Sequence, residues 1–214
     1  MDLRDMTLKD YVSRASSKDP VPGGGSVSAL VGALGGALSN MVCALTENKK
    51  AFLALGAEER ESFLNANEEI SKFGEKIFEV VQRDAEVFNT LINAMKLPKE
   101  TDEEKSKRNE TLQALYKEAL EVPMELAEGT YEILKRLPFL AKLGDKFAVS
   151  DAGCGALFAY AAGEAALFNV LINLNYITDL DYKEKMTEKK NFILRNSKLL
   201  RDEVLEIVYK RIEG

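Results

Sequence analysis

Polar side chains at four places in this sequence stand in or beside apolar stretches, where each needs a hydrogen-bonding partner or a ligand. Asp84 lies in the middle of a helical pattern, among valines and a phenylalanine. Burial there would raise the pKa of its carboxyl group and suit it to accept and return a proton. The structural alternative is an ordinary ion pair with Arg83 or Lys76.

The other three groups begin, interrupt or follow apolar stretches, and they are Ser150-Asp151, Asn169 with Asn173, and Lys49-Lys50. The two asparagines are four residues apart and therefore share one helix face. Each group also has an ordinary interpretation, namely a helix cap, a bridge between helices or a helix end, and a solvated surface. That all four polar groups have only an ordinary structural role is a weaker explanation than that some of them form a functional site. Their spacing alone does not identify a substrate.

A glycine-rich segment, Pro20 to Ser26, leads directly into an uncharged stretch that ends at Thr46. The glycines let the backbone bend or come very close to another group, and Ser26 is suited to cap the helix that follows. The free N–H groups of such a helix start favour an anion or an oxygen-rich ligand. The segment is not a nucleotide-binding P-loop, because no Gly-Lys-Ser/Thr follows. The alternative is a tight turn before a buried helix.

Composition excludes several kinds of chemistry. The 214 residues include no histidine, which removes His-dependent nucleophile systems and His-ligated metal sites. We therefore expect no metal, and proton transfer must fall to Asp, Glu, Lys, Tyr, Cys or water. A net charge of −6 argues against nucleic acid as a partner. Cys43 and Cys154 both lie in apolar stretches, so we expect small buried side chains and no disulfide.

The N-terminal segment carries charges throughout and lacks the apolar core of a signal peptide. The stretch from Val27 to Thr46 is long enough to span a membrane, but glycine, alanine and Asn40 dilute it. We therefore expect a cytoplasmic protein with no membrane role.

Apolar residues recur at helical spacing and nowhere alternate for long. The pattern predicts helices over residues 7–18, 27–46, 57–95, 101–138, 152–174 and from 179 to the C-terminus. We expect a kink or restart at Pro123, an end at Pro138 and a cap at Ser150. The fold class is thus all-α, an up-and-down bundle in one domain over residues 1–214, with two small-residue helices buried inside.

Small residues recur along the first apolar helix, as at Ala29, Ala33 and Ala37 or at Gly32 and Gly36. Such spacing lets helix axes approach closely. A face of this kind favours a homodimer; the alternative is close packing within one subunit.

Taken together, several segments resemble the cyclodeaminase/cyclohydrolase family, which includes the cyclodeaminase half of formiminotransferase-cyclodeaminase and stand-alone relatives. The segments occur in the family's order over nearly the whole chain, and they are Pro22 to Ser26, Asp84 to Phe88, Leu97 to Lys105, Ser150-Asp151 and Asn169 to Leu174. The transferase half is absent, so transfer of the formimino group is not expected.

The resemblance implies an all-α dimer and a tetrahydrofolate derivative as substrate, with no tightly bound cofactor. The activity is either cyclodeamination of 5-formimidoyltetrahydrofolate to 5,10-methenyltetrahydrofolate, with release of ammonia, or hydrolysis of 5,10-methenyltetrahydrofolate to 10-formyltetrahydrofolate. We favour the first because residues 169–174 look most like that branch. A helical assembly protein without catalysis is the alternative from another class.

The resemblance also suggests roles for residues. Asp84 is favoured as the residue that transfers the proton at the reacting centre, and Asp151 as the residue that orients the pterin or the bridge. The exchange of these two roles is nearly as well supported. The substrate-binding residues are Gly24, Gly25, Ser26, Lys49, Ser150, Asn169 and Asn173. Lys49 or Lys50 meets the glutamate tail or donates a proton to the departing nitrogen.

Overall fold

The computed structural model describes residues 2–214, which fold into helices joined by short turns, with no strand in that range. The elements are η1 (Leu3–Asp5), α1 (Leu8–Ala15), α2 (Gly24–Thr46), α3 (Lys50–Leu53), α4 (Ala57–Ala94), α5 (Asp102–Leu143), α6 (Val149–Leu174) and α7 (Leu180–Glu213). The predicted all-α class is confirmed. The sequence pattern missed the short elements η1 and α3.

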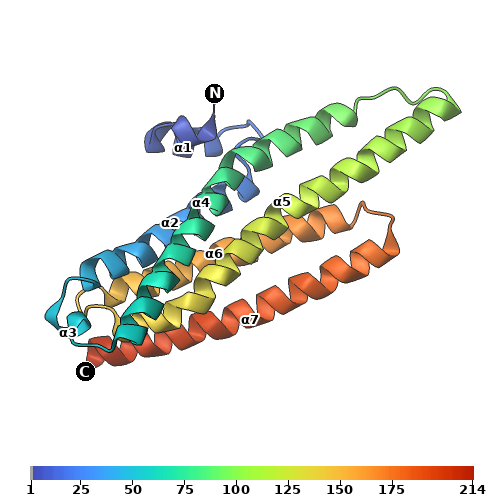
Figure 1. Cartoon of the computed structure of the whole chain (residues 1–214). Helices are drawn as coiled ribbons and strands as arrows, with labels where there is room; N and C mark the ends of the chain where they lie inside the picture. The colour runs from blue at the N-terminus through green and yellow to red at the C-terminus, as the bar shows by residue number, and fades with distance from the viewer. Residues whose placement is uncertain (1) are drawn as a thin grey trace.

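Helices α2, α4, α5 and α6 form an up-and-down bundle in which each runs antiparallel to the one before it, and α7 packs along α5 and α6 (Figure 1). The helix α4 and its partner α5 continue well past the start of α2 (Figure 1). Beyond Gly24, therefore, no continuation of α2 fills the space between α4 and α6.

Glycine contacts explain how closely the bundle helices approach. A Cβ on Gly36 would lie 3.5 Å from the Cα of Gly74 on α4, and a Cβ on Gly155 of α6 would lie 3.0 Å from the carbonyl oxygen of Gly35. A Cβ on Gly32 would meet side chains of three helices at 3.2 Å. The small residues of α2 therefore serve close packing within one subunit, which is the alternative raised from the sequence.

The helix α5 continues through both of its prolines, so the predicted end at Pro138 is wrong. Of the kink or restart predicted at Pro123, the restart does not occur. Pro123 has no N–H to offer the carbonyl four residues earlier, that of Ala119. The side chain of Asn173 on α6 supplies the missing donor, because its Nδ2 lies 2.9 Å from the Ala119 oxygen. A residue distant in sequence thus repairs the helix, which local sequence rules do not foresee.

Helix starts agree with the sequence in part. Thr101 and Glu104 form a reciprocal capping box, and Thr7 and Asp179 cap α1 and α7 through their side chains. The predicted caps at Ser26 and Ser150 are wrong. The residue before α2 is Gly23 and the residue before α6 is Ala148, and neither makes a side-chain cap. Ser26 instead lies inside the first turn of α2.

The helices α2 and α6 bury one face each and expose the other. By length and composition alone, both are long and apolar enough to cross a membrane. In the most apolar 18-residue segment of each helix, 39% of α2 and 44% of α6 is buried inside the protein. The exposed large side chains of these two adjacent helices are here called the α2–α6 face, and they are Leu34, Met41, Leu45, Leu157, Phe158, Phe168, Leu171 and Ile172. Cys154 lies on α6 and is exposed, so the prediction that both cysteines are buried is wrong for this one.

Candidate functional site

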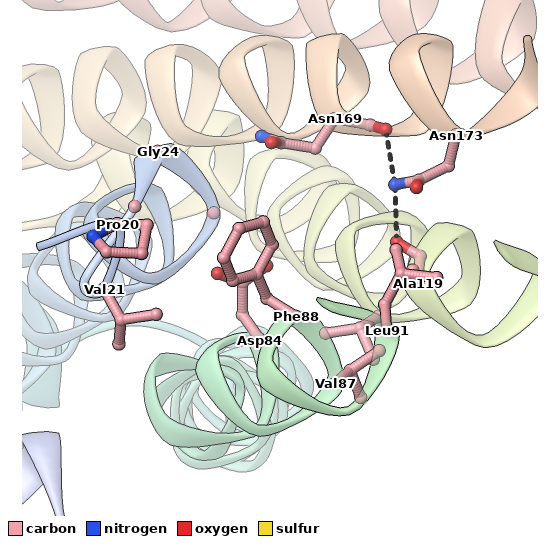
Figure 2. Close-up of a pocket in the computed structure, with 13 residues that line it drawn as sticks. Pro20, Val21, Gly24, Asp84, Val87, Phe88, Leu91, Ala119, Asn169 and Asn173 are labelled. Carbon is pink, nitrogen blue, oxygen red and sulfur yellow. Dashed lines mark hydrogen bonds between the residues drawn. The ribbon is translucent and has the colours of Figure 1, made fainter. Parts of the chain in front are cut away.

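A cavity of about 180 Å³ lies at the start of α2, where α4, α5 and α6 continue without it (Figure 2). Four segments line it: the glycine turn, the last turns of α4, the middle of α5 and the end of α6. The lining residues are Pro20, Val21, Gly23, Gly24, Gly25, Asp84, Val87, Phe88, Leu91, Ala119, Val122, Asn169 and Asn173. The cavity thus joins the predicted glycine turn, the predicted acid and both predicted amides.

The carboxylate of Asp84 contacts the first turn of α2. Its Oδ2 accepts hydrogen bonds from the backbone N–H and from the hydroxyl of Ser26, both at 2.9 Å. No residue in the range 2–214 donates a hydrogen bond to Oδ1. The ion pair with Arg83 or Lys76 that formed the alternative is not present. Nη1 of Arg83 pairs with Oε2 of Glu125 at 2.5 Å, and Nζ of Lys76 lies over the Phe73 ring. Asp84 is therefore held by a helix start and keeps one oxygen free.

Burial raises the pKa of the Asp84 carboxyl above its usual value, and the two hydrogen bonds from Ser26 oppose that rise. The direction of the shift follows from the surroundings, because apolar neighbours disfavour the charged form while donors favour it. Opposed influences of this kind suit a group that must gain and lose a proton during turnover. This confirms the direction expected from the sequence.

Gly25 is required where it stands. A Cβ at that position would lie 2.1 Å from Oδ1 of Asp84, so any side chain would displace the carboxylate. At Gly24 a Cβ would come no closer than 4.0 Å to Nδ2 of Asn169, across the cavity. As at any helix start, the N–H groups of Gly24 and Gly25 have no partner within α2. Two backbone donors therefore lie beside the carboxylate.

The amides Asn169 and Asn173 lie one turn apart on α6 and face the cavity (Figure 2). Asn173 Nδ2 donates to the carbonyl oxygens of Ala119 and of Asn169, each at 2.9 Å, and Asn169 Nδ2 donates to the Ala165 oxygen at 3.2 Å. These bonds fix how the amides are turned. Across residues 2–214, neither side-chain oxygen accepts a hydrogen bond, so both remain available to a ligand that carries N–H groups.

The remaining predicted site residues lie at the opposite end of the bundle. Ser150 and Asp151 occupy the first turn of α6, about 27 Å along that helix from Asn169 at 1.5 Å per residue. Lys50 begins α3, just beyond the far end of α2, and Lys49 lies 3.9 Å from Asp145 there. A single protomer therefore does not bring these four residues to the cavity.

The apolar wall of the cavity was not foreseen as part of a site. Val87, Phe88 and Leu91 follow Asp84 by three, four and seven residues, so all four share one face of α4. That spacing was visible in the sequence, where it indicated only a packing surface. Together with Val122 of α5, these side chains make the cavity suited to a flat, mostly apolar ring with a polar edge.

Within residues 2–214, no group of three or more His, Cys, Asp or Glu side chains is arranged to hold a metal ion. The site presents one proton-carrying carboxyl, two backbone donors and two amide acceptors around an apolar slot. Such a set can bind a nitrogen-rich heterocycle and move a proton between two of its atoms.

Comparison with known proteins adds independent information. The family model described as formiminotransferase-cyclodeaminase matches residues 7–191. A methenyltetrahydrofolate cyclohydrolase from Methylorubrum extorquens is 30% identical over 96% of this chain and 97% of its own length. A formimidoyltransferase-cyclodeaminase from Rattus norvegicus is 34% identical over 92% of this chain, which spans 36% of that longer protein.

The crystal structure of a formiminotetrahydrofolate cyclodeaminase from Thermotoga maritima superposes with a TM-score of 0.85 and 26% identity, covering 99% of this chain and 100% of the other. The fold and the family model thus agree over the same residues.

Proposed function

The chain belongs to the formiminotransferase-cyclodeaminase family, and from this premise we propose that it converts 5-formimidoyltetrahydrofolate to 5,10-methenyltetrahydrofolate with release of ammonia. At the coarser level it is a folate one-carbon enzyme of the cyclodeaminase or cyclohydrolase type. The observation that carries the proposal is the buried Asp84 carboxyl beside the start of α2, in a cavity that also holds two amide acceptors.

The chemistry needs one group that moves a proton. In the amidinium form of the substrate, N10 attacks the one-carbon unit on N5 and gives a tetrahedral carbon that bears N5, N10 and the exocyclic nitrogen. Asp84 takes the proton from N10 and returns it to the exocyclic nitrogen. That nitrogen leaves as ammonia, and the methenyl cation remains. A raised pKa lets the same carboxyl serve in both halves of the transfer.

Charge also favours this site. The substrate amidinium and the methenyl product are both cations, and a carboxylate in a partly enclosed cavity attracts them more strongly than a carboxylate in bulk water. Ser26 keeps the carboxylate in place through Oδ2, so Oδ1 can face the reacting carbon. No metal or nucleotide is needed for these steps, and we propose that the protein holds no tightly bound cofactor.

The amides account for recognition of the ring. A pterin carries a 2-amino group and a ring N–H side by side, and the free oxygens of Asn169 and Asn173 can accept from such a pair. The cavity of about 180 Å³ is below the roughly 300–1,000 Å³ of pockets that enclose drug-sized ligands. We therefore assign the ring and its one-carbon unit to the cavity and the glutamate tail to the space outside.

A coupled assay tests this proposal. Purified protein is mixed with 5-formimidoyltetrahydrofolate, and methenyl absorbance and ammonia are followed together. We expect both to appear in equal amounts with wild type and neither with Asp84→Asn. Absence of both with the wild-type protein, and no rise in melting temperature with folinate, would contradict the proposal and leave a non-catalytic helical assembly protein.

Methenyltetrahydrofolate cyclohydrolase is the second candidate, and one observation favours it. The Methylorubrum extorquens relative of that name matches over 97% of its own length, whereas this chain spans only 36% of the Rattus norvegicus formimidoyltransferase-cyclodeaminase. In this reaction Asp84 takes a proton from water as the water adds to the methenyl carbon, and it returns that proton to N5 as the bond from this carbon to N5 breaks. The hydroxyl on the carbon releases its proton to solvent and becomes the carbonyl of the 10-formyl group. The test compares the loss of methenyl absorbance from 5,10-methenyltetrahydrofolate with the release of ammonia from 5-formimidoyltetrahydrofolate. A faster rate in the first assay would assign the chain to this activity.

We also propose that the protein is a homodimer that packs through the α2–α6 face. The face is about 35 Å long, from the length of α2, and about 20 Å wide for two adjacent helices. That corresponds to about 700 Å² per subunit, close to the roughly 800 Å² per partner of a stable interface. A second copy presents the same apolar face, and pairing of the two faces would remove both from water. We further propose that the protein is cytoplasmic, without membrane or nucleic-acid partners.

A dimer of one particular symmetry would bring all the predicted site residues to one cavity. If the two-fold axis lies across α2 and α6, opposite ends of the two faces meet. The end that carries Lys49, Lys50, Ser150 and Asp151 in one copy then approaches the cavity of the other. On this proposal Asp151 orients the bridge, and the lysines meet the glutamate tail or the departing nitrogen.

A further inference from the structure

Phe88 on α4 keeps a large exposed surface although it lines the same cavity as Asp84. The residue is 36% exposed, whereas its apolar neighbours in the cavity wall, Val87 and Leu91, are 7% and 6% exposed. Single exposed apolar side chains are ordinary on a convex surface, but this one lies in a concave site beside a carboxylate. The exposed part of its ring is therefore a surface that a bound molecule can cover.

Phe88 and Asp84 form adjacent parts of one cavity wall. They are four residues apart on α4, and side chains at that spacing are neighbours on one helix face, with about 5–6 Å between their Cβ atoms. Both project from α4 towards the space between Gly24 and Asn169 (Figure 2). Because Ser26 holds the carboxylate through Oδ2, a ligand atom that contacts Oδ1 from the cavity lies next to the aromatic ring as well.

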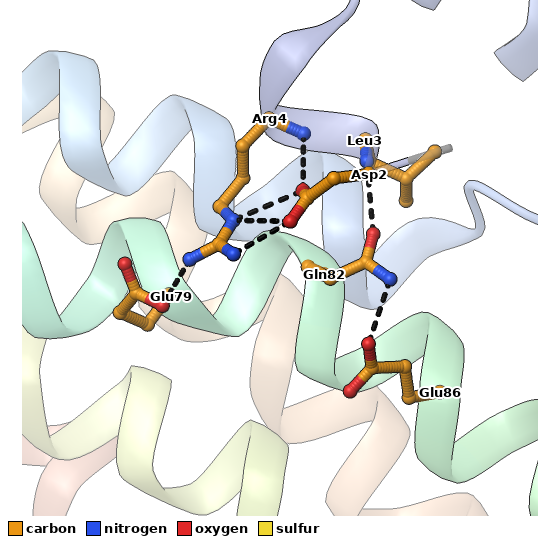
Figure 3. Close-up of polar contacts among 6 residues, drawn as sticks. All are labelled: Asp2, Leu3, Arg4, Glu79, Gln82 and Glu86. Carbon is orange, nitrogen blue, oxygen red and sulfur yellow. Dashed lines mark hydrogen bonds and ion pairs between the residues drawn. The ribbon is translucent and has the colours of Figure 1, made fainter.

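Asp84 carries the one formal charge among the described residues that line the cavity. Two further acids of this part of α4, Glu79 and Glu86, lie on the side that faces η1, where Arg4 and Gln82 contact them (Figure 3). The cavity lining therefore combines one negative charge with an aromatic ring and contains no positively charged side chain.

A planar cation is the ligand that this pair is best suited to recognise. The face of an aromatic ring carries partial negative charge, and it attracts a cation that lies within about 6 Å of the ring centre. A carboxylate in a partly enclosed site attracts the same cation. A neutral molecule of the same shape packs against the ring but gains neither electrostatic contribution, so the pair discriminates by charge.

We propose that Phe88 is a substrate-contacting residue whose ring, together with the Asp84 carboxylate, selects ligands that carry a planar, delocalised cation such as an amidinium. Where the inference names the ligand it rests on the proposed function, because the formimidoyl group in its amidinium form and the methenyl bridge are cations of this kind. It goes beyond that function because it assigns to Phe88 the preference for these charged one-carbon units over a neutral formyl group.

Graded fluorination of the ring tests the assignment. Mono-, di- and trifluorophenylalanine at position 88 withdraw electron density from the ring face and leave the shape of the side chain nearly unchanged. The ligands are 5,10-methenyltetrahydrofolate, which is a cation at the bridge, and folinate, which is neutral there. Calorimetry in an Asp84→Asn background measures binding without turnover. We expect affinity for the methenyl compound to fall stepwise, by about 3- to 30-fold in total, and affinity for folinate to change by less than about twofold.

Phe78 supplies the matched control. It is also 36% exposed on α4, but it lines a separate cavity of about 150 Å³ beside η1 and α1. Trifluorophenylalanine at position 78 should leave the affinity for both ligands unchanged. A loss of methenyl affinity equal to that at position 88 would show that fluorine acts through the protein as a whole, and it would overturn the inference.

Two results at position 88 would also contradict the inference. Unchanged affinity for the methenyl compound excludes contact between the ring and the cation. A parallel loss of affinity for both compounds shows that the ring contributes packing without selecting charge. Either result leaves turnover of the formimidoyl compound by the wild-type protein, and with it the proposed function, intact.

A pair of small compounds without a folate skeleton separates the inference from the proposed function. Benzamidine is a planar cation, and benzamide is a neutral molecule of nearly the same shape. In NMR titrations of the wild-type protein we expect benzamidine to bind more tightly, and Phe88→Leu to reduce that preference by about threefold or more while Phe78→Leu leaves it unchanged. This result in a protein without folate turnover keeps the inference and overturns the proposed function. An equal preference in Phe88→Leu and wild type overturns the inference.

Discussion

Asp84 occupies the space that a side chain at Gly25 would need: a Cβ there would lie 2.1 Å from Oδ1 of the carboxylate. The relationship links two segments that are far apart in the sequence. It explains why the turn ends in a residue without a side chain, since only glycine lets the carboxylate reach the N–H of Ser26.

Gly25→Ala should therefore displace the Asp84 carboxylate and lower kcat by about 100-fold or more, in the range that loss of a proton-transferring group produces. Steady-state kinetics with the formimidoyl substrate measure the effect. The matched control is Gly74→Ala on α4, where a Cβ meets nothing within 4 Å. That control should retain activity and gain up to about 1 kcal/mol of stability from helix propensity. Equal activity in both variants would contradict the role of Gly25.

Asp84→Asn keeps the size of the side chain and an acceptor for Ser26, but it removes the group that carries the proton. We expect kcat to fall by about 100- to 10,000-fold while folinate still raises the melting temperature. A variant that turns over within a few-fold of wild type would exclude Asp84 as the proton shuttle.

The same substitution should change how stability depends on pH. Because burial raises the Asp84 pKa, the folded state holds this proton over a range where the unfolded state, with a pKa near 3.8, has lost it. The stability contributed by protonated Asp84 is thus complete below the unfolded value and is lost as pH rises through the folded value. Asp84→Asn should therefore melt above wild type at pH 7, and the gap should close below about pH 4. Parallel melting curves at all pH values would show that Asp84 has no raised pKa.

Asn173 contributes to stability as well as to the cavity. Asn173→Leu leaves the Ala119 oxygen without a donor and should cost about 1–3 kcal/mol in urea unfolding. Adding Pro123→Ala restores an N–H four residues after Ala119, so the double variant should regain most of that stability. If the double variant is no more stable than the single one, the Ala119 oxygen does not depend on this donor.

Mixing of inactive variants tests the proposed dimer. Asp84→Asn and Asp151→Asn should each be nearly inactive alone. If the two residues act in the same cavity from different subunits, random mixing after refolding gives about one quarter of wild-type activity, because half the dimers are mixed and each has one intact site. Activity no higher than the average of the two single variants would show that Asp84 of one subunit and Asp151 of the other do not act in the same cavity.

Much of this architecture could be predicted from the sequence, because helical periodicity and turn residues are local signals. The long helix that begins at Ala57 and the helix start at Thr101 were both predicted correctly. Local rules failed where a distant residue intervened. Pro123 does not break α5 because Asn173 satisfies Ala119, and Ser26 does not cap α2 because it donates to Asp84.

The cavity could be predicted only in part. Asp84, the glycine turn and the two amides stood out as polar or small residues in apolar surroundings, and the structure brings them together. The apolar wall did not stand out, since its residue types are those of any core. Ser150, Asp151 and the lysines were joined to the site by resemblance, and whether they reach it depends on a contact between copies that helical periodicity does not describe.

The bond from Asn173 to the Ala119 oxygen ties a ligand-facing amide to a proline on another helix. Any lineage that exchanges Asn173 to accept a different ring loses the support of α5 at the same moment. Adaptation of the cavity to new compounds should therefore proceed through paired replacements at 123 and 173, and directed evolution that varies either position alone will meet a stability barrier.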